Sequence, residues 1–560
     1  MKKIMQIDAA RGRLPKQETV FKIIDELIPH GLNGIIFYME CLAESKVFPV
    51  EKIDSYIIPQ SYLKEIDSFC KSRNVEFIPH FDVPGHQENL LRIPDMKKYA
   101  DMEDCIRLDL PEVREKIKEY ITEVSSCFSS KYIHCGGDET FRLGMGASRE
   151  FYRKHGFEKV FSDFVNELNA HVKSLGKTLL FYADVPIVYP GLAGKLDPDI
   201  VMNNWAYCIR NECYEAENYH YSRHAAGTAG HPLWVTTNCM AEYLFTPFYR
   251  LKENVDIWRE LGKNAIGLTI SDWGTHENCN PYVLSVLGTM YAMHRFENPD
   301  YTNDEFLCDA SNLILGREDT VFMEAYRILL NASGRNYWSD RALYFSVPVS
   351  LLFFGDPDSR SITRLAVFSD PEKFKLLETD VRRAVSLMNS IDSDGVKEPD
   401  WLNDLKKLAN RVLIAVIRGK LCFRHAFDTG GIWFTDEDLQ PIVNEYEEYK
   451  SLVEKDRAFL IKNWKRDAYG SALARCLEHY DKAVEETAHA IRLPENILRV
   501  YPPEEYSQGD TPMPDSIPVD KQVRLLLKQM TPDEKTDQLV KVRGFKEIET
   551  RINNDKQNST

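Results

Sequence analysis

The chain has 560 residues, of which 43% are hydrophobic and 11% aromatic, and its formal net charge is −16 at pH 7. It is too long for one ordinary domain, and its composition is that of a globular protein rather than a disordered one. The negative charge argues against nucleic acid and anionic membranes as partners, and no apolar run approaches the ~20 residues that span a bilayer.

The N-terminus and the cysteines bear on the cellular compartment. Charged Asp8 and Arg11 follow Met1 too closely for an apolar signal segment. None of the 12 cysteines forms a Cys-x-x-Cys pair, which suits reduced thiols better than a disulfide framework or a zinc site. We therefore expect a cytoplasmic protein, although a leader already removed would leave the same pattern.

Apolar, strand-like runs alternate with amphipathic helical stretches from the first residues to about Arg295. The predicted strands are Ile4–Ala9, Gly34–Tyr38, Glu76–Phe81, Tyr132–Cys135, Thr178–Tyr182, Ile200–Asn203, Leu233–Thr237 and Ala265–Ile270. The predicted helices between them include Thr19–Pro29, Ser61–Arg73, Pro111–Phe128, Val160–Leu175 and Phe248–Leu261. The last helix is expected to end at Gly262 as a left-handed C-terminal glycine.

Strands joined by helical crossovers predict an α/β fold, a parallel (β/α)8 TIM-type barrel, over residues 1–300. An open doubly wound sheet would carry a Gly-rich phosphate loop after its first strand. Here that strand runs into Ala9-Ala10-Arg11-Gly12-Arg13, which is no nucleotide fingerprint.

The later segments have helical spacing and few strand signals. They are Asp370–Asn389, Trp401–Phe427, Glu437–Trp464 and Gly470–Arg492. They predict a mainly α-helical C-terminal domain over residues 301–500. Residues 501–560 are interpreted as a Pro-rich linker, a capped helix beginning at Thr531 and a polar tail.

Chemistry-bearing residues gather just past the predicted strands. They are Arg11; Glu40; Asp82 with His86; Asp138 with Glu139; Asp184 beside Tyr182; Trp205 with Tyr207; Asn238; and Asp272 with Trp273. Barrel active sites lie at this end of the strands. Aromatic faces beside carboxylates are typical of a sugar pocket, because a pyranose has an apolar face and a polar rim. Either Trp taken alone is as readily explained as a core aromatic.

The most informative stretch is Lys131–Thr140, an apolar run followed by two glycines and the pair Asp138-Glu139. The glycines allow a sharp turn with open space beside it. Neighbouring carboxylates repel and raise at least one pKa, which suits a general acid working near neutrality. A solvated acidic turn is the alternative for a Gly-Gly-Asp-Glu sequence taken without its context.

These motifs resemble those of the glycoside hydrolase family 20 β-N-acetylhexosaminidases. The resemblance covers roughly the first 300 residues. It is carried by Ile7-Asp8-Ala9-Ala10-Arg11, by Phe81-Asp82-Val83-Pro84-Gly85-His86, by His134-x-Gly136-Gly137-Asp138-Glu139, and by Trp205 and Trp273. The Tyr38-Met39-Glu40 element is similar to the branch that lacks the usual N-terminal α/β domain.

The resemblance implies an exo-acting, retaining hydrolase that releases terminal β-linked GlcNAc or GalNAc. In this family the acetamido oxygen of the substrate attacks the anomeric carbon and gives an oxazolinium intermediate. Glu139 would be the general acid/base, and Asp138 would hold the acetamido group while its field keeps Glu139 protonated. No cofactor and no metal are expected, the partner would be an oligosaccharide substrate, and a homodimer is a hypothesis.

The resemblance also implies roles for the surrounding residues. Those expected to bind substrate are Arg11, Tyr182, Asp184, Trp205, Trp273 and Glu277. Those expected to support them from behind are Glu40, Asp82, His86 and His134. The motifs do not distinguish gluco- from galacto-configured sugars.

The chain departs from the family pattern at positions that shape the substrate pocket. Tyr182 stands where the family usually has Trp, so it either forms a smaller wall beside the acetamido methyl or points into the barrel core. The usual Trp-x-Glu becomes Trp273-Gly274-Thr275-His276-Glu277. The usual Tyr of the seventh strand has no clean match, and Asn238 or Tyr243 stands in for it.

Three other functions are open at this stage. A conventional two-carboxylate glycosidase would pair Asp138 or Glu139 with a distant acid such as Asp184. A non-catalytic sugar-binding protein could use the same pocket. A zinc hydrolase built on His80, His86 and His134 is the least favoured, because a histidine in a strand is more often a buried, hydrogen-bonded residue.

Overall fold

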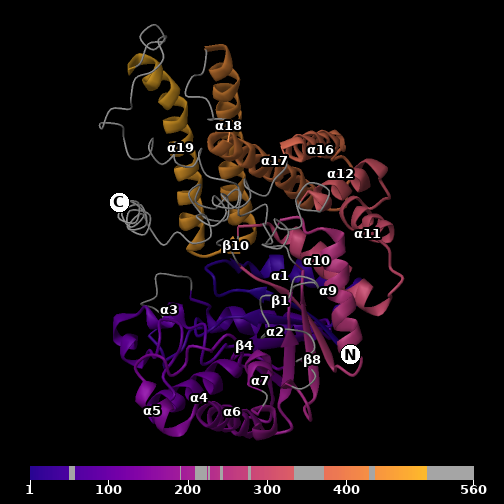
Figure 1. The fold of residues 1–560 in the computed structure, drawn as a ribbon. Helices are drawn as coiled ribbons and strands as arrows, with labels where there is room; N and C mark the ends of the chain where they lie inside the picture. Colours follow the sequence, from indigo (N-terminus) through magenta and orange to yellow (C-terminus); the bar gives the residue numbers. More distant parts are fainter. Residues whose placement is uncertain are drawn as a thin grey trace, which may run out of the picture. The chain divides into compact units, whose positions relative to one another are not determined.

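The computed structural model describes residues 1–49, 57–189, 191–207, 224, 227–239, 244–274, 279–332, 371–427 and 436–500. Its centre is a closed barrel with the strand order β1-β3-β4-β5-β6-β7-β8-β9 (Figure 1). Every neighbouring pair is parallel, including β1 with β9, which closes the barrel. The predicted (β/α)8 fold is confirmed.

The barrel strands match the predicted ones to within a few residues at their ends. They are β1 (Lys2–Asp8), β3 (Gly34–Tyr38), β4 (Glu76–His80), β5 (Tyr132–His134), β6 (Thr178–Tyr182), β7 (Val201–Trp205), β8 (Leu233–Asn238) and β9 (Gly267–Asp272). Apolar residues from seven of these strands fill one level of the interior: Ile4, Ile36, Ile78, Tyr132, Leu180, Val201 and Trp234. A Cβ on Gly267 of β9 would overlap the Trp234 ring, so the glycine makes room for the largest member of this layer.

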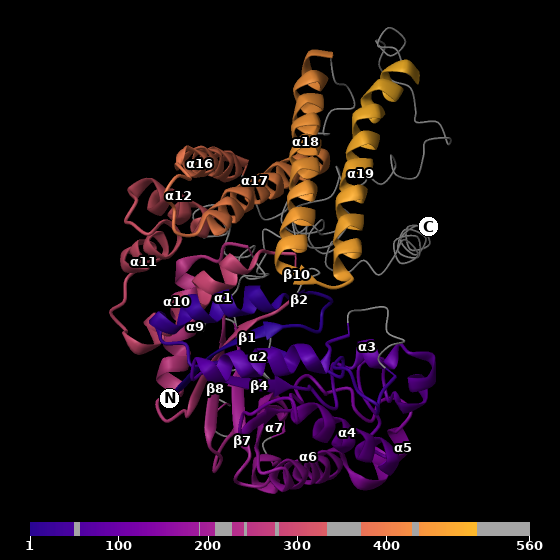
Figure 2. The same cartoon turned by 180° about the vertical axis from the view of Figure 1, so that it is seen from behind.

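Amphipathic helices surround the strands, as the opposite views of Figures 1 and 2 show. The longer ones are α1 (Gln17–Leu27), α2 (Gln60–Ser72), α4 (Pro111–Ser125), α6 (Phe157–Ser174), α9 (Phe248–Leu261) and α10 (Tyr282–Glu297). The short ones are α3 (Glu88–Leu91), α5 (Arg149–His155), α7 (Asp184–Val188), η1 (Ile28–His30), η3 (Pro94–Tyr99) and η4 (Ala193–Lys195). Helix α1 illustrates the principle, because Val20, Ile23, Ile24 and Leu27 recur at helical spacing and are buried.

Helix α9 ends where the sequence predicts, but for a different reason. Gly262 has φ −93°, so the expected left-handed conformation is wrong. A Cβ at this position would lie 2.7 Å from the Trp258 carbonyl oxygen and 3.1 Å from the side chain of Val235. The glycine is therefore needed for close packing of the turn against β8.

The helices after the barrel confirm the helical segments predicted there. They are α11 (Asn303–Leu315), α12 (Thr320–Asn331), α16 (Pro371–Ser390), α17 (Pro399–Phe427), α18 (Asp436–Asp467) and α19 (Ala472–Val500). The predicted linker and the helix from Thr531 lie outside the described residues. No helix in the described part of the chain has both the length and the apolar character needed to cross a bilayer.

The chain divides into two compact units. The first comprises Met1–Asn331, Ala384–Leu408 and Arg457–Glu478, and the second comprises Ala332–Arg383, Ala409–Asp456 and His479–Thr560. Within the first unit, β10 (Ala468–Tyr469) forms an antiparallel pair with β2 (Leu14–Pro15). The domain boundaries predicted at residues 300 and 500 stay predictions.

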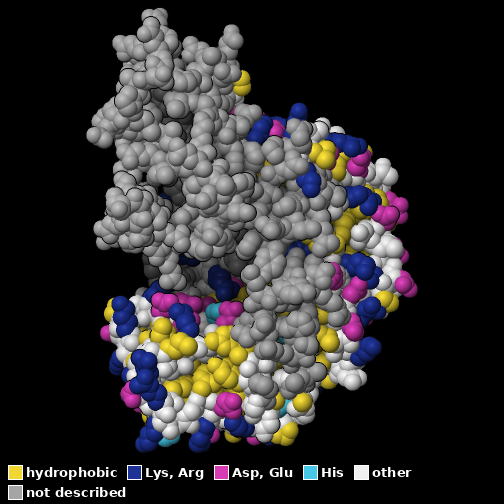
Figure 3. Space-filling model, in the orientation of Figure 1, with side chains coloured by type: hydrophobic (Ala, Val, Ile, Leu, Met, Phe, Trp, Pro, Cys, Tyr) yellow, Lys and Arg dark blue, Asp and Glu magenta, His cyan; other side chains and the backbone are white. Residues whose placement is uncertain are grey.

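Charged groups of both signs are interspersed with apolar side chains over the described surface that Figure 3 shows. The net negative charge of the chain is therefore not gathered into one acidic patch on that surface.

Candidate active site

The strands bring the predicted polar and aromatic residues to one end of the barrel. Asp8 ends β1, Trp205 ends β7 and Asp272 ends β9. Glu40 follows β3, Asp82 and His86 follow β4, and the pair Asp138-Glu139 follows β5. Because all strands are parallel, these residues share the C-terminal face, where barrel active sites are built.

Four of these residues have a left-handed backbone, which is uncommon for residues other than glycine. Their φ angles are 50° at Glu40, 51° at Asp82, 49° at His86 and 54° at Glu139. Such conformations cost on the order of 1–3 kcal/mol each and persist where the surrounding structure imposes them. Their concentration at one barrel face marks it as the functional face.

Glycine is required at the two positions before the acid pair, because neighbouring side chains occupy the space where a Cβ atom would lie. Gly136 and Gly137 have φ of 63° and 87°. A Cβ on Gly136 would overlap the Asp82 carboxyl, and one on Gly137 would overlap the Phe181 ring. The Gly137 amide donates to Asp82 Oδ1 at 3.0 Å, so the turn is tied to the end of β4.

The two neighbouring carboxyls of the pair differ sharply in environment. Asp138 is 6% exposed, whereas the side chain of Glu139 is 51% exposed. Burial raises the pKa of Asp138, and the charge of Glu139 adds to this effect. Burial and then the charge of Asp138 also raise the pKa of Asp82 well above its usual range. Asp138 and Asp82 are thus buried at this face of the barrel, whereas Glu139 is half exposed there.

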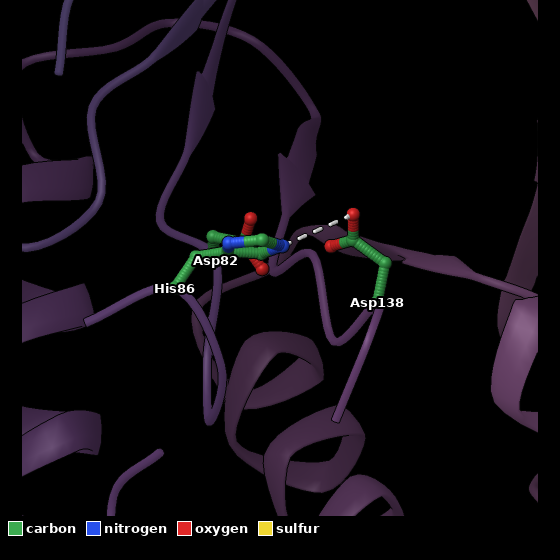
Figure 4. Close-up of side chains that lie close together, drawn as sticks. All are labelled: Asp82, His86 and Asp138. Atoms are coloured by element: carbon green, nitrogen blue, oxygen red, sulfur yellow. Dashed lines mark ion pairs between the residues drawn. The ribbon is translucent and has the colours of Figure 1, made fainter. Parts of the chain in front are cut away.

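His86 lies between these carboxyls. Its Nε2 is 3.4 Å from Glu139 Oε2 and 3.7 Å from Asp138 Oδ2, and Figure 4 shows the imidazole beside Asp82 and directed at Asp138. Burial by itself would lower the pKa of His86, but the hydrogen bond to Glu139 and the charges of Asp138 and Asp82 raise it to about 11. His86 is therefore an imidazolium ion at neutral pH.

The contact with His86 bears on the expectation that the charge of Asp138 keeps Glu139 protonated. The hydrogen bond from His86 lowers the pKa of Glu139, which outweighs the effect of partial burial. In the free site this hydrogen bond therefore opposes the effect expected of Asp138 on the pKa of Glu139. The sequence shows the adjacent carboxylates of Asp138 and Glu139. It does not show that His86 contacts Glu139.

Asp184 contacts the backbone of the acid pair. Its Oδ2 accepts a hydrogen bond from the Glu139 amide at 2.8 Å, and the residue is 1% exposed. Burial, followed by the charge of Asp138, raises its pKa well above the usual range. This placement fits an anchor for the left-handed backbone of Glu139 better than a group that reaches substrate, and the predicted substrate contact stays a prediction.

Arg11 is held at the mouth of the barrel by Asp8. Its Nη1 donates to Asp8 Oδ2, and Asp8 Oδ1 accepts from the amides of Ala10 and Arg11 at 3.0 and 3.2 Å. Asp8 Oδ2 also accepts from the Gly274 amide at 2.8 Å, so it joins the ends of β1 and β9. The Arg11 side chain remains 33% exposed, which leaves it accessible to a ligand. Asp8 is absent from the predicted site, although it lies within the motif that pointed to Arg11.

The aromatic residues form a connected group beside Arg11. The Arg11 guanidinium lies 5.3 Å from the ring centres of both Tyr38 and Trp273. Trp273 Nε1 donates to the Tyr207 hydroxyl at 2.9 Å, and the ring of Tyr207 is 5.3 Å from that of Trp205. The predicted pairing of Trp205 and Trp273 near the acids is thus present, with Tyr207 as the link. Glu277 and Tyr243 lie outside the described residues.

Glu40 and His134 are buried behind the acid pair. Glu40 accepts from Asn89 Nδ2 at 3.0 Å, and burial raises its pKa to about 7. His134 Nδ1 accepts from the Gly136 amide at 3.0 Å, its Nε2 is 2.9 Å from Asn203 Nδ2, and burial lowers its pKa to about 3. Since both ring nitrogens of His134 are engaged, the zinc site built on His80, His86 and His134 is disfavoured.

One cluster in the described part of the chain has the spacing of a metal site. Ligand atoms of Asp82, His86 and Asp138 lie within 4.8 Å of one another (Figure 4). The same spacing also fits an ion-pair cluster, since His86 Nε2 lies 3.7 Å from Asp138 Oδ2 and 3.4 Å from Glu139 Oε2. The prediction of no metal and no cofactor stays a prediction.

Comparison with known proteins places this geometry in a family. Residues 43–223 match the model of the "Glycosyl hydrolase family 20, catalytic domain". That segment contains Asp82, His86, the acid pair and Asp184 in the arrangement described above. This segment of the chain is therefore similar to the catalytic domain of glycoside hydrolase family 20.

Curated proteins also resemble part of the chain. "Beta-hexosaminidase subunit A1" of Dictyostelium discoideum is 27% identical over 226 residues, which are 36% of this chain and 40% of that protein. "Beta-hexosaminidase subunit beta" of Rattus norvegicus is 25% identical over 207 residues, 32% of this chain and 38% of that protein. The chain therefore spans less than half of the length of these relatives. The solved structure of Flavobacterium johnsoniae chitobiase is 14% identical and covers 81% of this chain and 78% of its own, with a TM-score of 0.48.

Tyr182 is the clearest departure of this chain from the expected pocket. It is 1% exposed, and its hydroxyl lies 3.3 Å from Gln6 Oε1, a buried residue of β1. Its ring centre is 4.4 Å from that of His134. These contacts place Tyr182 inside the barrel and favour the core alternative over a wall beside the acetamido methyl.

Proposed function

We propose that this chain is an exo-acting, retaining β-N-acetylhexosaminidase that works through an oxazolinium intermediate. The observation that carries the proposal is the contrast within the acid pair. A buried Asp138 and a half-exposed Glu139 occupy adjacent positions at the end of β5. One carboxyl can hold a substrate group from below while the other exchanges protons at the pocket surface.

The proposed first step breaks the glycosidic bond. Glu139 gives its proton to the leaving oxygen while the acetamido carbonyl oxygen attacks the anomeric carbon. Positive charge develops on the acetamido nitrogen, and Asp138 accepts the hydrogen bond from that N–H. Such an interaction is strongest in the transition state, so it raises kcat more than it lowers KM.

The second step opens the oxazolinium ring. Glu139, now ionised, takes a proton from water as the water attacks the anomeric carbon, and the acetamido group is restored with retained configuration. Glu139 ends this step protonated, and it must still carry that proton when the next substrate is bound. Covering its carboxyl with a neutral sugar removes water and raises the pKa of an acid, which offsets the lowering by His86.

The conventional two-carboxylate alternative is less well supported. It needs a second carboxyl that faces the sugar across a gap of about 5 Å or more. Asp184, the candidate in the sequence, is buried and accepts from the Glu139 backbone instead. It has little freedom to attack an anomeric carbon.

The decisive experiment is a panel of aryl β-glycosides with the same leaving group. The set would carry a 2-acetamido, a 2-trifluoroacetamido or a 2-hydroxyl group, in gluco and galacto forms. We expect turnover of the acetamido compounds, slower turnover as fluorine weakens the nucleophilic oxygen, and none of the 2-hydroxyl glycoside. Equal rates for 2-acetamido and 2-hydroxyl substrates would refute substrate assistance, and no turnover of any compound would favour a sugar-binding protein.

Two further parts of the proposal are a cytoplasmic location and a homodimer. Cell fractionation tests the first, and light scattering of the purified chain tests the second.

A further inference from the structure

Arg13 is a fully buried cation two residues after Arg11, and its contacts join three separate segments. Its Nη1 donates to the carbonyl oxygen of Asn280, and its Nη2 donates to Asn463 Oδ1 at 3.1 Å. Its guanidinium also lies over the rings of Tyr282 and Trp464, at 4.3 and 5.2 Å from their centres. A planar guanidinium can donate at its edge and stack on its faces at once, which an ammonium group cannot.

Two of these segments carry the residues expected to bind the sugar. Arg13 itself belongs to the connection between β1 and α1, which presents Arg11. Asn280 belongs to the connection between β9 and α10, which presents Trp273, and Tyr282 is the first residue of α10. Asp8 joins the same two connections nearer the strands, through its bonds to Arg11 and to the Gly274 amide. Arg13 therefore forms a second link between them, farther from the barrel.

The third segment comes from the end of α18 and the start of α19, within the same compact unit. It contacts the β1–α1 connection through backbone atoms: the Lys16 amide donates to the Asp467 carbonyl at 2.8 Å, and the Ala472 amide donates to the Gly12 carbonyl at 3.2 Å. A Cβ on Gly12 would lie 2.8 Å from Ala472 Cβ, and one on Gly470 would overlap the Gly12 carbonyl. These two segments of the chain approach each other so closely that a displacement of one would require a displacement of the other.

We propose that Arg13, held by Asn463 and Trp464, is a positioning residue that sets the orientation of Arg11 toward the sugar. Segment 463–472, which joins α18 to α19, is then part of the sugar-binding framework, although Asn463 lies 450 residues from Arg13 in sequence. The kinetic consequence rests on the proposed function, whereas the structural consequence does not.

The kinetic test compares Arg13→Met with a matched control. Arg295 is also buried, and it holds Asp256 at 2.7 and 2.8 Å and the Tyr301 carbonyl at 3.1 Å, at the opposite end of α10 from Tyr282. We expect Arg13→Met to raise KM for an aryl 2-acetamido glycoside about tenfold while kcat changes less than about threefold, since sugar hydroxyl contacts are lost in ground and transition state alike. Arg295→Met should lower the melting temperature and leave KM within about twofold of wild type. Arg13→Lys should restore little, because it lacks the fork and the stacking faces.

A double-variant cycle with Arg11→Met tests whether Arg13 acts through Arg11. If it does, Arg13→Met has no further effect on KM once Arg11 is replaced, because residues that act through one contact are not additive. Additive changes in KM would overturn the positioning role.

Hydrogen exchange tests the same role without turnover. Arg13→Met and Asn463→Ala should speed amide exchange in residues 9–16 relative to Arg295→Met, measured at equal distance below each melting temperature. Equal exchange in all three variants would overturn the inference. A wild-type chain that hydrolyses no glycoside would remove only the proposed function, and the exchange comparison would then decide the role of Arg13.

Discussion

Replacing Asp184 distinguishes two roles for this residue. Either it anchors the Glu139 backbone, or its carboxylate takes part in the reaction. The structure gives it one partner at the acid pair, the Glu139 amide, which donates to Asp184 Oδ2 at 2.8 Å. Asp184→Ala removes this acceptor, whereas Asp184→Asn keeps an oxygen that accepts the same bond without the charge. An anchoring role predicts that Ala is far more damaging than Asn.

The expected loss of activity in Asp184→Ala follows from the hydrogen bond between Asp184 and the Glu139 amide and from the left-handed backbone of Glu139. An amide left without its acceptor costs about 1–3 kcal/mol. Glu139 has φ 54°, and a left-handed backbone costs a similar amount, roughly 1–3 kcal/mol, so the released residue would relax to an ordinary conformation. A displacement of about 1 Å at a reacting group can lower the rate about 10²-fold. We therefore expect kcat to fall about 10²-fold in Asp184→Ala and about tenfold or less in Asp184→Asn.

The assay is kcat on an aryl 2-acetamido glycoside with a poor leaving group, because that substrate depends most on a correctly placed Glu139. Melting temperatures of both variants show that each remains folded. If Asp184→Asn is as inactive as Asp184→Ala, the carboxylate itself takes part in the reaction. The anchoring argument would then be wrong, and the two-carboxylate alternative would regain support.

Four further predictions concern Glu139, His86 and Tyr182. Glu139→Gln should lower kcat about 10²–10⁴-fold on poor leaving groups and much less on activated aryl glycosides; equal losses on both would argue against an acid role. His86→Gln removes the hydrogen bond that lowers the pKa of Glu139, so the descending, high-pH limb of the kcat/KM profile should move to higher pH; an unmoved limb would show that another group controls it. Because the folded pKa of His86 is raised to about 11, its stabilising ion pairs are complete below its unfolded pKa of about 6.5 and lost as the pH rises toward 11. The melting-temperature gap between wild type and His86→Gln should therefore shrink from pH 6 to pH 10. Tyr182→Trp should destabilise the chain by about 1–3 kcal/mol through overpacking and leave the N-acetyl to N-propionyl selectivity unchanged; altered selectivity at unchanged stability would restore the pocket-wall role.

The barrel could be predicted because its strands are short apolar runs separated by helix-length segments. Gly34–Tyr38 and Thr178–Tyr182 have the predicted bounds, and the other strands differ by at most two residues at either end. Strand parallelism then brings the residues after each strand together, which is why Asp82, His86 and Glu139 could be assigned to one site before any contact was known. Periodicity and topology are properties that a sequence displays directly.

Conformation and pairing at single residues were harder to predict. Nothing in the sequence marks Glu40, Asp82, His86 and Glu139 as left-handed, since no glycine stands at these positions. The contact of Arg13 with Asn463 joins residues 450 apart, and no local pattern reveals it. Tyr182 could be assigned to a strand end, but whether its side chain faces the pocket or Gln6 depends on strand tilt.

The acid pair shows how a local conformation creates functional asymmetry. Asp138 and Glu139 are identical in charge and adjacent in sequence, yet one is buried against Asp82 and the other is half exposed. The left-handed backbone at Glu139, anchored by Asp184, turns its carboxyl away from Asp138. The same turn brings it to His86, whose charge lowers the pKa of Glu139, while burial raises the pKa of Asp138. In the proposed mechanism a proton would therefore enter and leave at Glu139, and the buried carboxyl would respond to charge that develops on a bound ligand. This division of roles depends on the backbone at one residue, which is why Asp184, whose carboxylate anchors that backbone, is predicted to matter as much as a residue that touches the sugar.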